Sequence, residues 1–211
     1  MSAEAVYPGV PIAIARPGTG YPGGAMAEGK EGRPLEWERV DSEGREEYAV
    51  FRVRTDWARS PRTGEVEEFD IAVSPDGVTV VATTAEGEVV MVEQFRHALR
   101  TVTMETPSGF MDEGESPLEA ALRELREETG YEGDDPRVIG CLELNPSWQT
   151  TRVYVVAVKN ARRTASTDLD EAEDIRVLTV SRERARELVR TGGIRATVAV
   201  SALALAEWAG D

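Results

Sequence analysis

The chain has 211 residues, and its 39 Asp and Glu residues outnumber its 24 Lys and Arg residues, which gives a formal net charge of −15. This negative charge argues against binding to nucleic acid or to an anionic membrane, so we expect neither partner. The single cysteine, Cys141, leaves no pair for an internal disulfide and fits a cytoplasmic protein. A hydrophobic content of 41% without an apolar run of about 18 residues is typical of a globular chain without a membrane span.

Composition divides the chain into three regions. Residues 1–34 are rich in Gly and Pro and have no helical or strand period, so we predict a flexible extension; an arm that docks on a partner subunit is the alternative. Residues 35–75 are rich in β-forming residues. Residues 76–211 contain strand patterns before and after a central helical pattern, which indicates a larger layered domain.

Hydrophobic periodicity predicts the elements in chain order. Residues 47–57 and 67–73 are predicted strands, and the turn-forming stretch Ser60–Glu65 between them predicts a hairpin. Further apolar β-forming runs predict strands at residues 78–84, 89–95, 137–144, 152–158 and 174–180. Two helices are predicted near the end of the chain, at Ser181–Thr191 and Ala196–Trp208. The order predicts an α/β (α+β) fold with a mixed sheet covered by helices.

A short helix in the middle of the chain has clear end signals. Ser116 is a good N-cap, Pro117 suits the first helical position, and Glu119 completes a capping box. Gly130 can adopt the left-handed conformation that ends a helix. Within the helix, an apolar stripe at i, i+3, i+4 and i+7 is expected to face the core, and it consists of Leu118, Ala121, Leu122 and Leu125.

The same helix carries an unusual density of carboxylates. Glu124, Glu127 and Glu128 are spaced i, i+3 and i+4, so their side chains converge on one patch beside the apolar stripe. Like charges at this spacing repel, and a hard divalent cation such as Mg²⁺, or Mn²⁺ as the alternative, would cancel the repulsion. Arg123 reaches Glu127 at i+4 and is expected to orient it. The alternative for these glutamates is an ordinary solvated helix surface.

The segment from Gly109 to Tyr131 resembles the box of the Nudix hydrolase superfamily, G-x5-E-x7-R-E-U-x-E-E-x-G-U. Every charged and glycine position matches in register, and only the last position departs, because Tyr131 replaces the usual aliphatic residue. The flanking stretches "EQFRHAL" and "METPSGFMDEGE" resemble the ADP-ribose pyrophosphatase and nucleoside-diphosphate-sugar hydrolase branch. The resemblance implies a Nudix α/β/α sandwich with a mixed sheet, preceded by a small antiparallel β-rich region.

The resemblance also implies a function. The chain is expected to be a Nudix pyrophosphohydrolase that uses a metal ion to cleave the diphosphate of a nucleoside diphosphate derivative, with ADP-ribose giving AMP and ribose 5-phosphate. The alternatives are hydrolysis of another nucleotide sugar or of a modified nucleoside triphosphate, and a non-catalytic Nudix domain that senses ADP-ribose or NAD. The implied metal ligands are the carbonyl oxygen of Ser108 and the carboxylates of Glu124, Glu127 and Glu128, with Glu127 also a catalytic candidate.

Residues outside the box complete the expected site. Arg96 would bind the diphosphate, because a guanidinium matches two phosphate oxygens, and Glu105 would fix Arg96 or the terminal sugar. Trp37 would stack on the base, although packing is the alternative for an aromatic residue in a β-rich segment. The acidic loop before residue 175 offers a general base, for which Glu171 is preferred with Glu173 as helper; a solvated charged turn is the alternative. In this branch residues 35–75 are exchanged between subunits, so we expect a homodimer.

Overall fold

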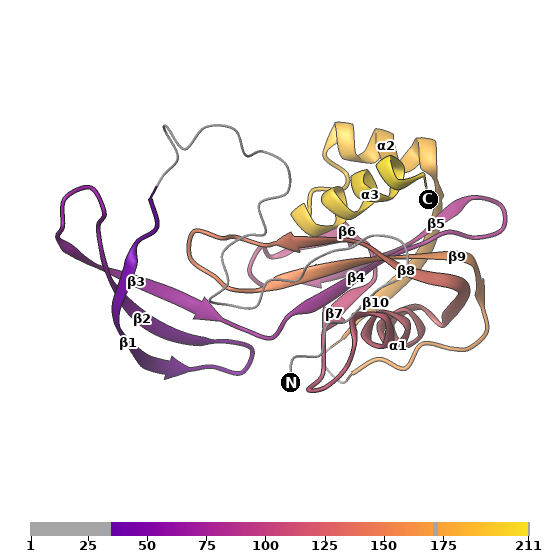
Figure 1. Ribbon diagram of the computed structural model, residues 1–211. Helices are drawn as coiled ribbons and strands as arrows, with labels where there is room; N and C mark the ends of the chain where they lie inside the picture. Colours follow the sequence, from indigo (N-terminus) through magenta and orange to yellow (C-terminus); the bar gives the residue numbers. More distant parts are fainter. Residues whose placement is uncertain (1–34, 171–172, 211) are drawn as a thin grey trace. The chain divides into compact units, whose positions relative to one another are not determined.

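The computed structural model describes residues 35–170 and 173–210, and it divides the chain into two compact units after Val73 (Figure 1). The predicted flexible extension at residues 1–34 and the candidate base Glu171 lie outside the described residues. None of the described helices is long and apolar enough to cross a membrane. The three predicted regions stay predictions.

The N-terminal unit is a three-stranded antiparallel sheet. Its strands lie in the order β1 (Glu38–Glu47), β2 (Arg52–Arg59) and β3 (Val66–Val73). The predicted hairpin is confirmed as β2 and β3, but β2 begins at Arg52 instead of residue 47. Strand β1 has no strand pattern in the sequence because it contains a glycine and many charged residues, and all of it is exposed. Charged side chains suit an edge strand, where they discourage further strand pairing.

The C-terminal unit contains two sheets. One has the order β7-β4-β9-β8 and the other has the order β10-β5-β6. Strands β4 and β9 are parallel and all other pairs are antiparallel, so the predicted mixed sheet is confirmed. The strands are β4 (Gly77–Ala82), β5 (Glu88–Arg96), β6 (Thr101–Glu105), β7 (Ser108–Phe110), β8 (Tyr131–Glu143), β9 (Arg152–Arg163) and β10 (Ile175–Ser181).

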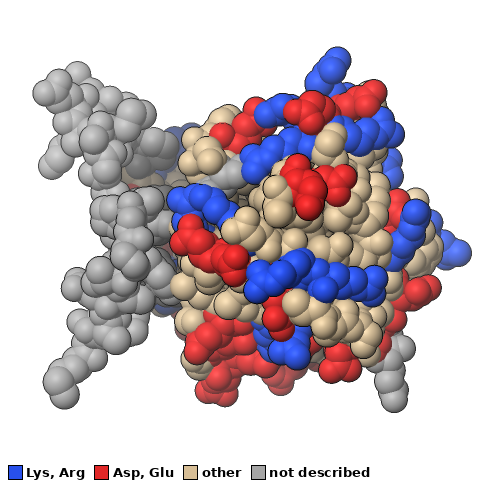
Figure 2. Space-filling view, turned by 90° about the vertical axis from the view of Figure 1, so that its right-hand side faces the viewer, with Lys and Arg blue, Asp and Glu red and all other residues tan. Residues whose placement is uncertain are grey.

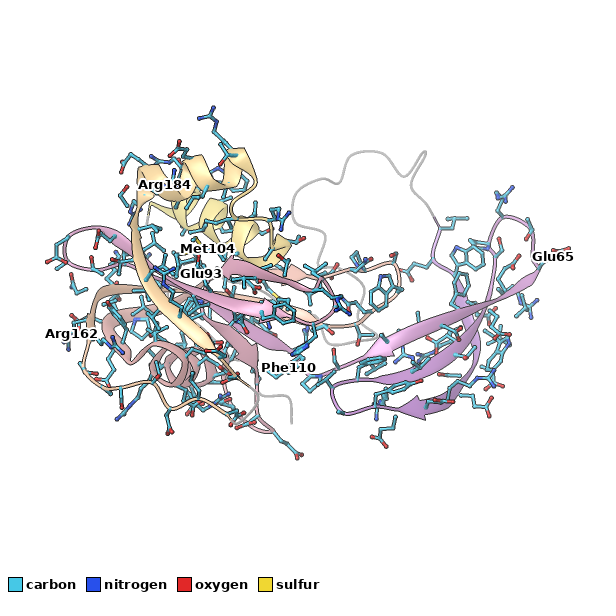
Figure 3. All side chains as sticks on the ribbon, turned by 180° about the vertical axis from the view of Figure 1, so that it is seen from behind. Glu65, Glu93, Met104, Phe110, Arg162 and Arg184 are labelled. Carbon is cyan, nitrogen blue, oxygen red and sulfur yellow. The ribbon has the colours of Figure 1, made fainter. Side chains whose placement is uncertain are left out.

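Helices cover both faces of these sheets, as expected for a Nudix sandwich (Figure 1). Helix α1 (Pro117–Thr129) lies on one side, and α2 (Arg182–Thr191) and α3 (Thr197–Ala209) lie on the other. Val81, Met91, Val155 and Ile194 belong to the core under α2 and α3, and Met104 packs against it from β6 (Figure 3). Helix α1 and the site described below lie on the other face of the sheets.

Charge on the surface is mixed. On the face that Figure 2 shows, basic and acidic side chains alternate, and no continuous basic surface forms among the described residues there. Double-stranded nucleic acid is normally bound by a basic patch or stripe.

Candidate active site

Helix α1 begins and ends as its sequence predicts. The Ser116 hydroxyl accepts a hydrogen bond from the Glu119 backbone N–H at 3.3 Å, and the Glu119 carboxylate accepts one from the Ser116 N–H at 2.9 Å. Gly130 closes the helix in the left-handed conformation, with φ of 72°. These interactions satisfy backbone groups at the ends of the helix and set its position in the chain. The two ends of the helix therefore fix where the carboxylates of its last two turns lie.

The buried face of α1 differs from the predicted apolar stripe. Leu125 and Ala121 are buried, but Leu118 and Leu122 are only half-buried. The burial line continues instead to Glu128, whose exposed fraction is 3%. The prediction placed Glu128 beside the buried stripe because a carboxylate counts as polar in a hydrophobicity pattern. In the fold, the last turn of α1 faces β7 as well as β8, and a carboxylate occupies the buried position.

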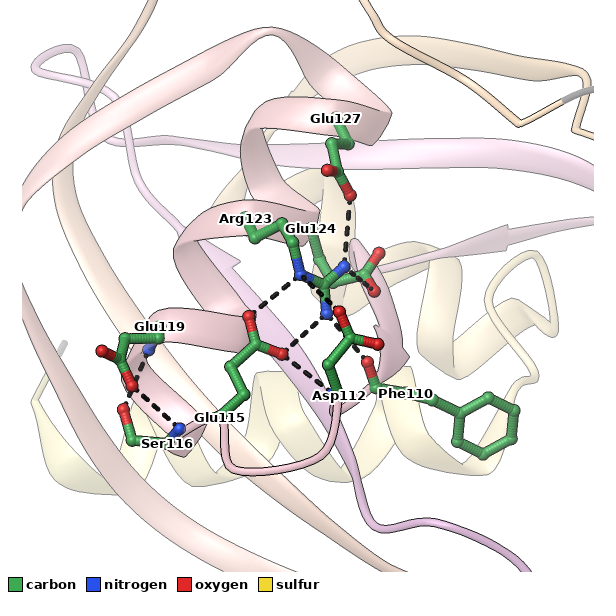
Figure 4. Close-up of polar contacts among 8 residues, drawn as sticks. All are labelled: Phe110, Asp112, Glu115, Ser116, Glu119, Arg123, Glu124 and Glu127. Atoms are coloured by element: carbon green, nitrogen blue, oxygen red, sulfur yellow. Dashed lines mark hydrogen bonds and ion pairs between the residues drawn. The ribbon is translucent and has the colours of Figure 1, made fainter.

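Arg123 connects the acidic groups of this region (Figure 4). Its guanidinium donates to both carboxylate oxygens of Glu115, at 3.0 and 2.9 Å, and to Glu124 Oε1 at 2.8 Å. It also donates to Glu127 Oε2 at 3.2 Å and to the Phe110 carbonyl oxygen at 3.0 Å. The hydrogen bonds to Glu115 hold the pKa of Arg123 far above its usual value and lower the pKa of that carboxyl. One cation therefore fixes three carboxylates of the box.

The two most buried carboxylates of the helix are held at an electrostatic cost. Burial raises the pKa of Glu128 to about 8, although its Oε2 accepts a hydrogen bond from the Ser108 N–H at 2.9 Å. Burial also raises the pKa of Glu124, and the negative charges of Glu127 and Glu173 add to the effect. A carboxylate that is desolvated beside other carboxylates is a favourable place for an external cation.

Gly109 allows Glu124 to approach the backbone of β7. A Cβ atom built on Gly109 would overlap the Glu124 carboxylate. The side chain of Glu124 is 13% exposed and lies over the strand at this position. Only a residue without a side chain leaves this space open, so the glycine at the start of the box has a steric reason.

Arg96 and Glu105 form a bidentate ion pair between β5 and β6. The Arg96 Nε and Nη2 atoms donate to the two Glu105 oxygens at 2.9 and 2.7 Å, and the Thr103 hydroxyl donates to Glu105 Oε1 at 2.5 Å. Burial acts to raise the pKa of Glu105, but these hydrogen bonds outweigh it and the pKa is lowered. The hydrogen bond from Arg96 to Glu105 likewise raises the pKa of Arg96. Two of the five N–H groups of the guanidinium are thus used to orient it.

The acidic loop after β9 closes the site from a third side. The Asp168 N–H donates to the Glu127 carbonyl oxygen at 2.9 Å, which ties the loop to the end of α1. Asp170 and Glu173 form a local turn, since the Asp170 N–H donates to Glu173 Oε2 at 3.2 Å and the Glu173 N–H donates to the Asp170 carbonyl at 2.9 Å. A cavity of about 530 Å³ is lined by this loop, by Arg96 and by the carboxylates of α1.

Comparison with known proteins agrees with this geometry. Residues 73–194, more than half of the chain, match the NUDIX domain family. The chain belongs to the NUDIX family. The predicted family and the predicted enzyme class, a Nudix pyrophosphohydrolase, are therefore confirmed.

Individual Nudix relatives and one solved structure extend the comparison. An ADP-ribose pyrophosphatase of Bacillus subtilis is 36% identical over 129 residues, which cover 61% of this chain and 70% of that protein. A methanol dehydrogenase activator of Bacillus methanolicus is 30% identical over 162 residues, 75% of this chain and 87% of that protein. A crystal structure of an ADP compounds hydrolase has a TM-score of 0.73 at 20% identity and covers 83% of this chain and 95% of its own. The Nudix fold is confirmed.

The donor set of the Nudix box fits a divalent cation. Glu124, Glu127 and Glu128 offer hard oxygen ligands, and burial raises the pKa of Glu124 and of Glu128, which disfavours the charged form of these two groups in the absence of a cation. Within residues 35–170 and 173–210, no three acidic, His or Cys side chains already converge as metal ligands. Glu124 and Glu127 accept hydrogen bonds from Arg123, and Glu128 accepts one from the backbone N–H of Ser108. Binding a metal would require these carboxylates to exchange partners.

The structure brings most of the predicted site residues together. Arg96, Ser108, Glu173 and the three glutamates of α1 line one cavity, and Glu105 lies behind Arg96. Trp37 belongs to the N-terminal unit, where its ring packs edge-on against Phe69 at 5.4 Å between centroids. Its substrate-binding role stays a prediction. Gln94, to which the sequence assigned no role, also lines the cavity, and so does Asp168, one of the carboxylates of the acidic loop.

Proposed function

We propose that this Nudix protein hydrolyses the diphosphate of ADP-ribose to AMP and ribose 5-phosphate. The relative from Bacillus subtilis carries that substrate in its name, ADP-ribose pyrophosphatase, and is similar to this chain over 129 residues. The observation that carries the proposal is the position of the buried carboxylate of Glu128 and the half-buried carboxylate of Glu124. They lie one helical turn apart in a cavity that also contains Arg96.

The proposed site would hold Mg²⁺, or Mn²⁺ as the alternative, on Glu124, Glu127, Glu128 and the Ser108 carbonyl oxygen. Such an ion neutralises phosphate charge and lowers the pKa of bound water. The chain itself would position the reactants. In the reaction, a water oxygen bonds to one phosphorus, the bridging P–O bond breaks, and the bridging oxygen leaves on the other phosphate. One proton of the water is taken up by a carboxylate.

Arg96 is the proposed ligand for the diphosphate. Its Nε and Nη2 atoms are occupied by Glu105, which leaves Nη1 available to a phosphoryl oxygen. Because Glu105 fixes the guanidinium plane, little side-chain entropy remains to be lost when substrate binds. For the general base we propose Glu171, with Glu173 as helper. Glu173 lines the cavity, and its loop is attached to the end of α1 through Asp168.

One assay tests the proposed reaction. The purified chain is incubated with ADP-ribose and Mg²⁺, and the products are separated by chromatography. AMP and ribose 5-phosphate in equal amounts are expected, and their appearance should require a divalent cation. Parallel incubations with ADP-glucose, GDP-mannose and an oxidised dNTP distinguish the alternative substrates. Binding of ADP-ribose or NAD without turnover would instead support the sensing alternative.

A second candidate function comes from the relative named methanol dehydrogenase activator. That similarity extends over 75% of this chain and 87% of the relative, which is more than the similarity to the Bacillus subtilis pyrophosphatase. Activation is tested by measuring the turnover rate of a methanol dehydrogenase with and without this chain. If the Glu124→Gln variant still increases that rate, activation is independent of diphosphate hydrolysis. If the variant no longer increases it, activation depends on hydrolysis.

We also propose that the chain is a cytoplasmic homodimer, with residues 35–75 at the subunit interface. In the N-terminal sheet, four large apolar side chains have exposed fractions of 40–48%, and these are Trp37, Val40, Val66 and Phe69. Within residues 35–73 the three strands form a single layer that cannot bury such residues by itself, and a second subunit would bury them. Sedimentation equilibrium at micromolar concentration should give twice the 23.1 kDa chain mass. A fully active monomer would contradict the dimer.

A further inference from the structure

Gln94 has the only side-chain amide among the described residues that line the cavity, and its nitrogen has no hydrogen-bond partner there. It lies on β5 two residues before Arg96, so the two side chains share a face of the strand, and both line the cavity that contains Glu124 and Glu128. Across the sheet it faces Thr103 on β6 and Ile175 on β10. Its Nε2 atom is buried and has no hydrogen-bond acceptor among the described residues.

An unpaired buried donor of this kind is unfavourable in the free protein. Buried side-chain donors nearly always have a partner, and one without a partner loses its hydration without compensation. The fold gives no reason for the amide, because the preceding residues on this face of β5, Val90 and Val92, are apolar and fully buried. The Gln94 amide therefore has no role in stabilising the fold, and it lies in an open cavity. We expect its hydrogen-bond acceptor to be part of a bound ligand.

The charge of the cavity explains why an uncharged donor is useful at this position. Seven Asp and Glu side chains are among the described residues of the lining, against two arginines. Both arginines already pair with carboxylates: Arg123 with Glu115, Glu124 and Glu127, and Arg96 with Glu105. A further cation at position 94 would meet the same carboxylates. An amide carries no charge to attract them and remains free to bind an incoming anion.

We propose that the Gln94 amide donates a hydrogen bond to a phosphoryl oxygen of the bound diphosphate, beside the contact made by Arg96. The last torsion of a glutamine side chain is soft, so the nitrogen can turn to an acceptor that enters the cavity. Gln94 is then a substrate-binding residue that recognises the diphosphate rather than the nucleoside or the sugar. This inference rests on the proposed function only in requiring a ligand with a diphosphate.

Gln94→Met tests the inference, since it removes the amide and keeps the length of the side chain. The probe is methylenediphosphonate with Mg²⁺, measured by isothermal titration, because it contains the diphosphate skeleton common to every candidate substrate. A hydrogen bond to a charged group corresponds to a loss of affinity of about tenfold or more. Gln94→Glu, which keeps the shape but loses the donor, should also weaken binding. Gln149→Met is the matched control, since Gln149 does not line this cavity.

Thermal melting of the ligand-free proteins separates a binding role from a structural one. If the unpaired amide serves only the ligand, Gln94→Met should melt at the wild-type temperature or above it, because a buried donor without a partner has been removed. A variant that melts earlier would assign Gln94 to the fold and overturn the inference. Equal affinity of wild type and Gln94→Met for methylenediphosphonate, or a wild-type chain that does not bind it, would also overturn it. Failure to cleave ADP-ribose would count against the proposed function alone.

Discussion

The carboxylate of Glu124 occupies the space into which a side chain at Gly109 would project. Residues 15 positions apart in the sequence are therefore fitted to each other, and the contact depends on the way β7 passes under α1. The glycine does not need an unusual backbone conformation here, since no positive φ is found at Gly109. Its role is to leave room for the Glu124 carboxylate.

Gly109→Ala should therefore reduce activity by displacing Glu124. Because the overlap is with the end of a flexible side chain, the fold should survive and the melting temperature should change little. We expect kcat to fall roughly 10²-fold, as if Glu124 had been removed. The control is Gly44→Ala, where a Cβ atom meets nothing within 4 Å. Wild-type turnover of Gly109→Ala would show that the present position of Glu124 is not needed for catalysis.

Glu124→Gln and Glu128→Gln should each lose about 10²-fold or more in rate, which corresponds to about 2.7 kcal/mol of transition-state stabilisation. The physical reason is the loss of a charged oxygen ligand for Mg²⁺ while shape is kept. Steady-state rates in saturating Mg²⁺ measure the effect, and circular dichroism checks the fold. Glu119→Gln is the control, since that carboxylate serves the N-cap and not the cavity. Unchanged rates for both variants would show that the carboxylates of the box do not contribute to hydrolysis.

The ends of α1 could be predicted because their signals are local. A capping box and a closing glycine involve residues within one turn of each other, and the structure has both. The strand β1 could not be predicted, because seven of its ten residues are charged, all ten are exposed, and among the described strands it pairs only with β2. Burial of Glu128 was missed for a related reason. A periodicity analysis assigns carboxylates to solvent, whereas this one is covered by the backbone at Ser108.

The relation between Arg96 and Glu105 could be predicted in part. Glu105 was expected to fix either Arg96 or the terminal sugar, and the structure has the ion pair with Arg96. The choice between the two depends on the register of β5 and β6, in which Arg96 faces Thr101 and Val92 faces Glu105. Gln94 stands in the stretch "EQFRHAL", whose resemblance to the branch gave a role to Arg96 and none to Gln94. Only its buried and unpaired nitrogen identifies it.

The raised pKa of Glu128 predicts how stability depends on pH without metal. With a folded-state pKa of about 8 and an unfolded-state value near 4.5, the folded protein keeps a proton that the unfolded chain loses. The free energy of unfolding should therefore fall as pH rises from about 4.5 to 8, by up to about 1.4 kcal/mol per pH unit. Urea denaturation in EDTA measures the slope, and Glu128→Gln should lack it. Identical slopes would show that Glu128 does not titrate in this window.

The last prediction concerns the acidic loop. Glutamates that bind Mg²⁺ have little basicity left, so a separate carboxylate is needed to accept a proton from the attacking water. Glu173 lines the cavity, and its loop is fixed to α1 by the Asp168 hydrogen bond, so it can reach bound substrate. Glu171→Gln should lower kcat and leave the affinity for ADP-ribose nearly unchanged, because the base acts mainly in the transition state. Glu173→Gln should have a smaller effect, and the double variant the largest.

Measuring kcat and KM from pH 6 to 10 for wild type and the three variants tests this assignment. Glu183→Gln, an exposed carboxylate on α2, is the control. If a loop carboxylate is the base, its removal should lower kcat, since the group that accepts the proton is gone. Wild-type kcat in both single variants and in the double variant, across the whole pH range, would exclude the loop. Proton removal would then depend on Glu127 or on activation of the water by the metal alone.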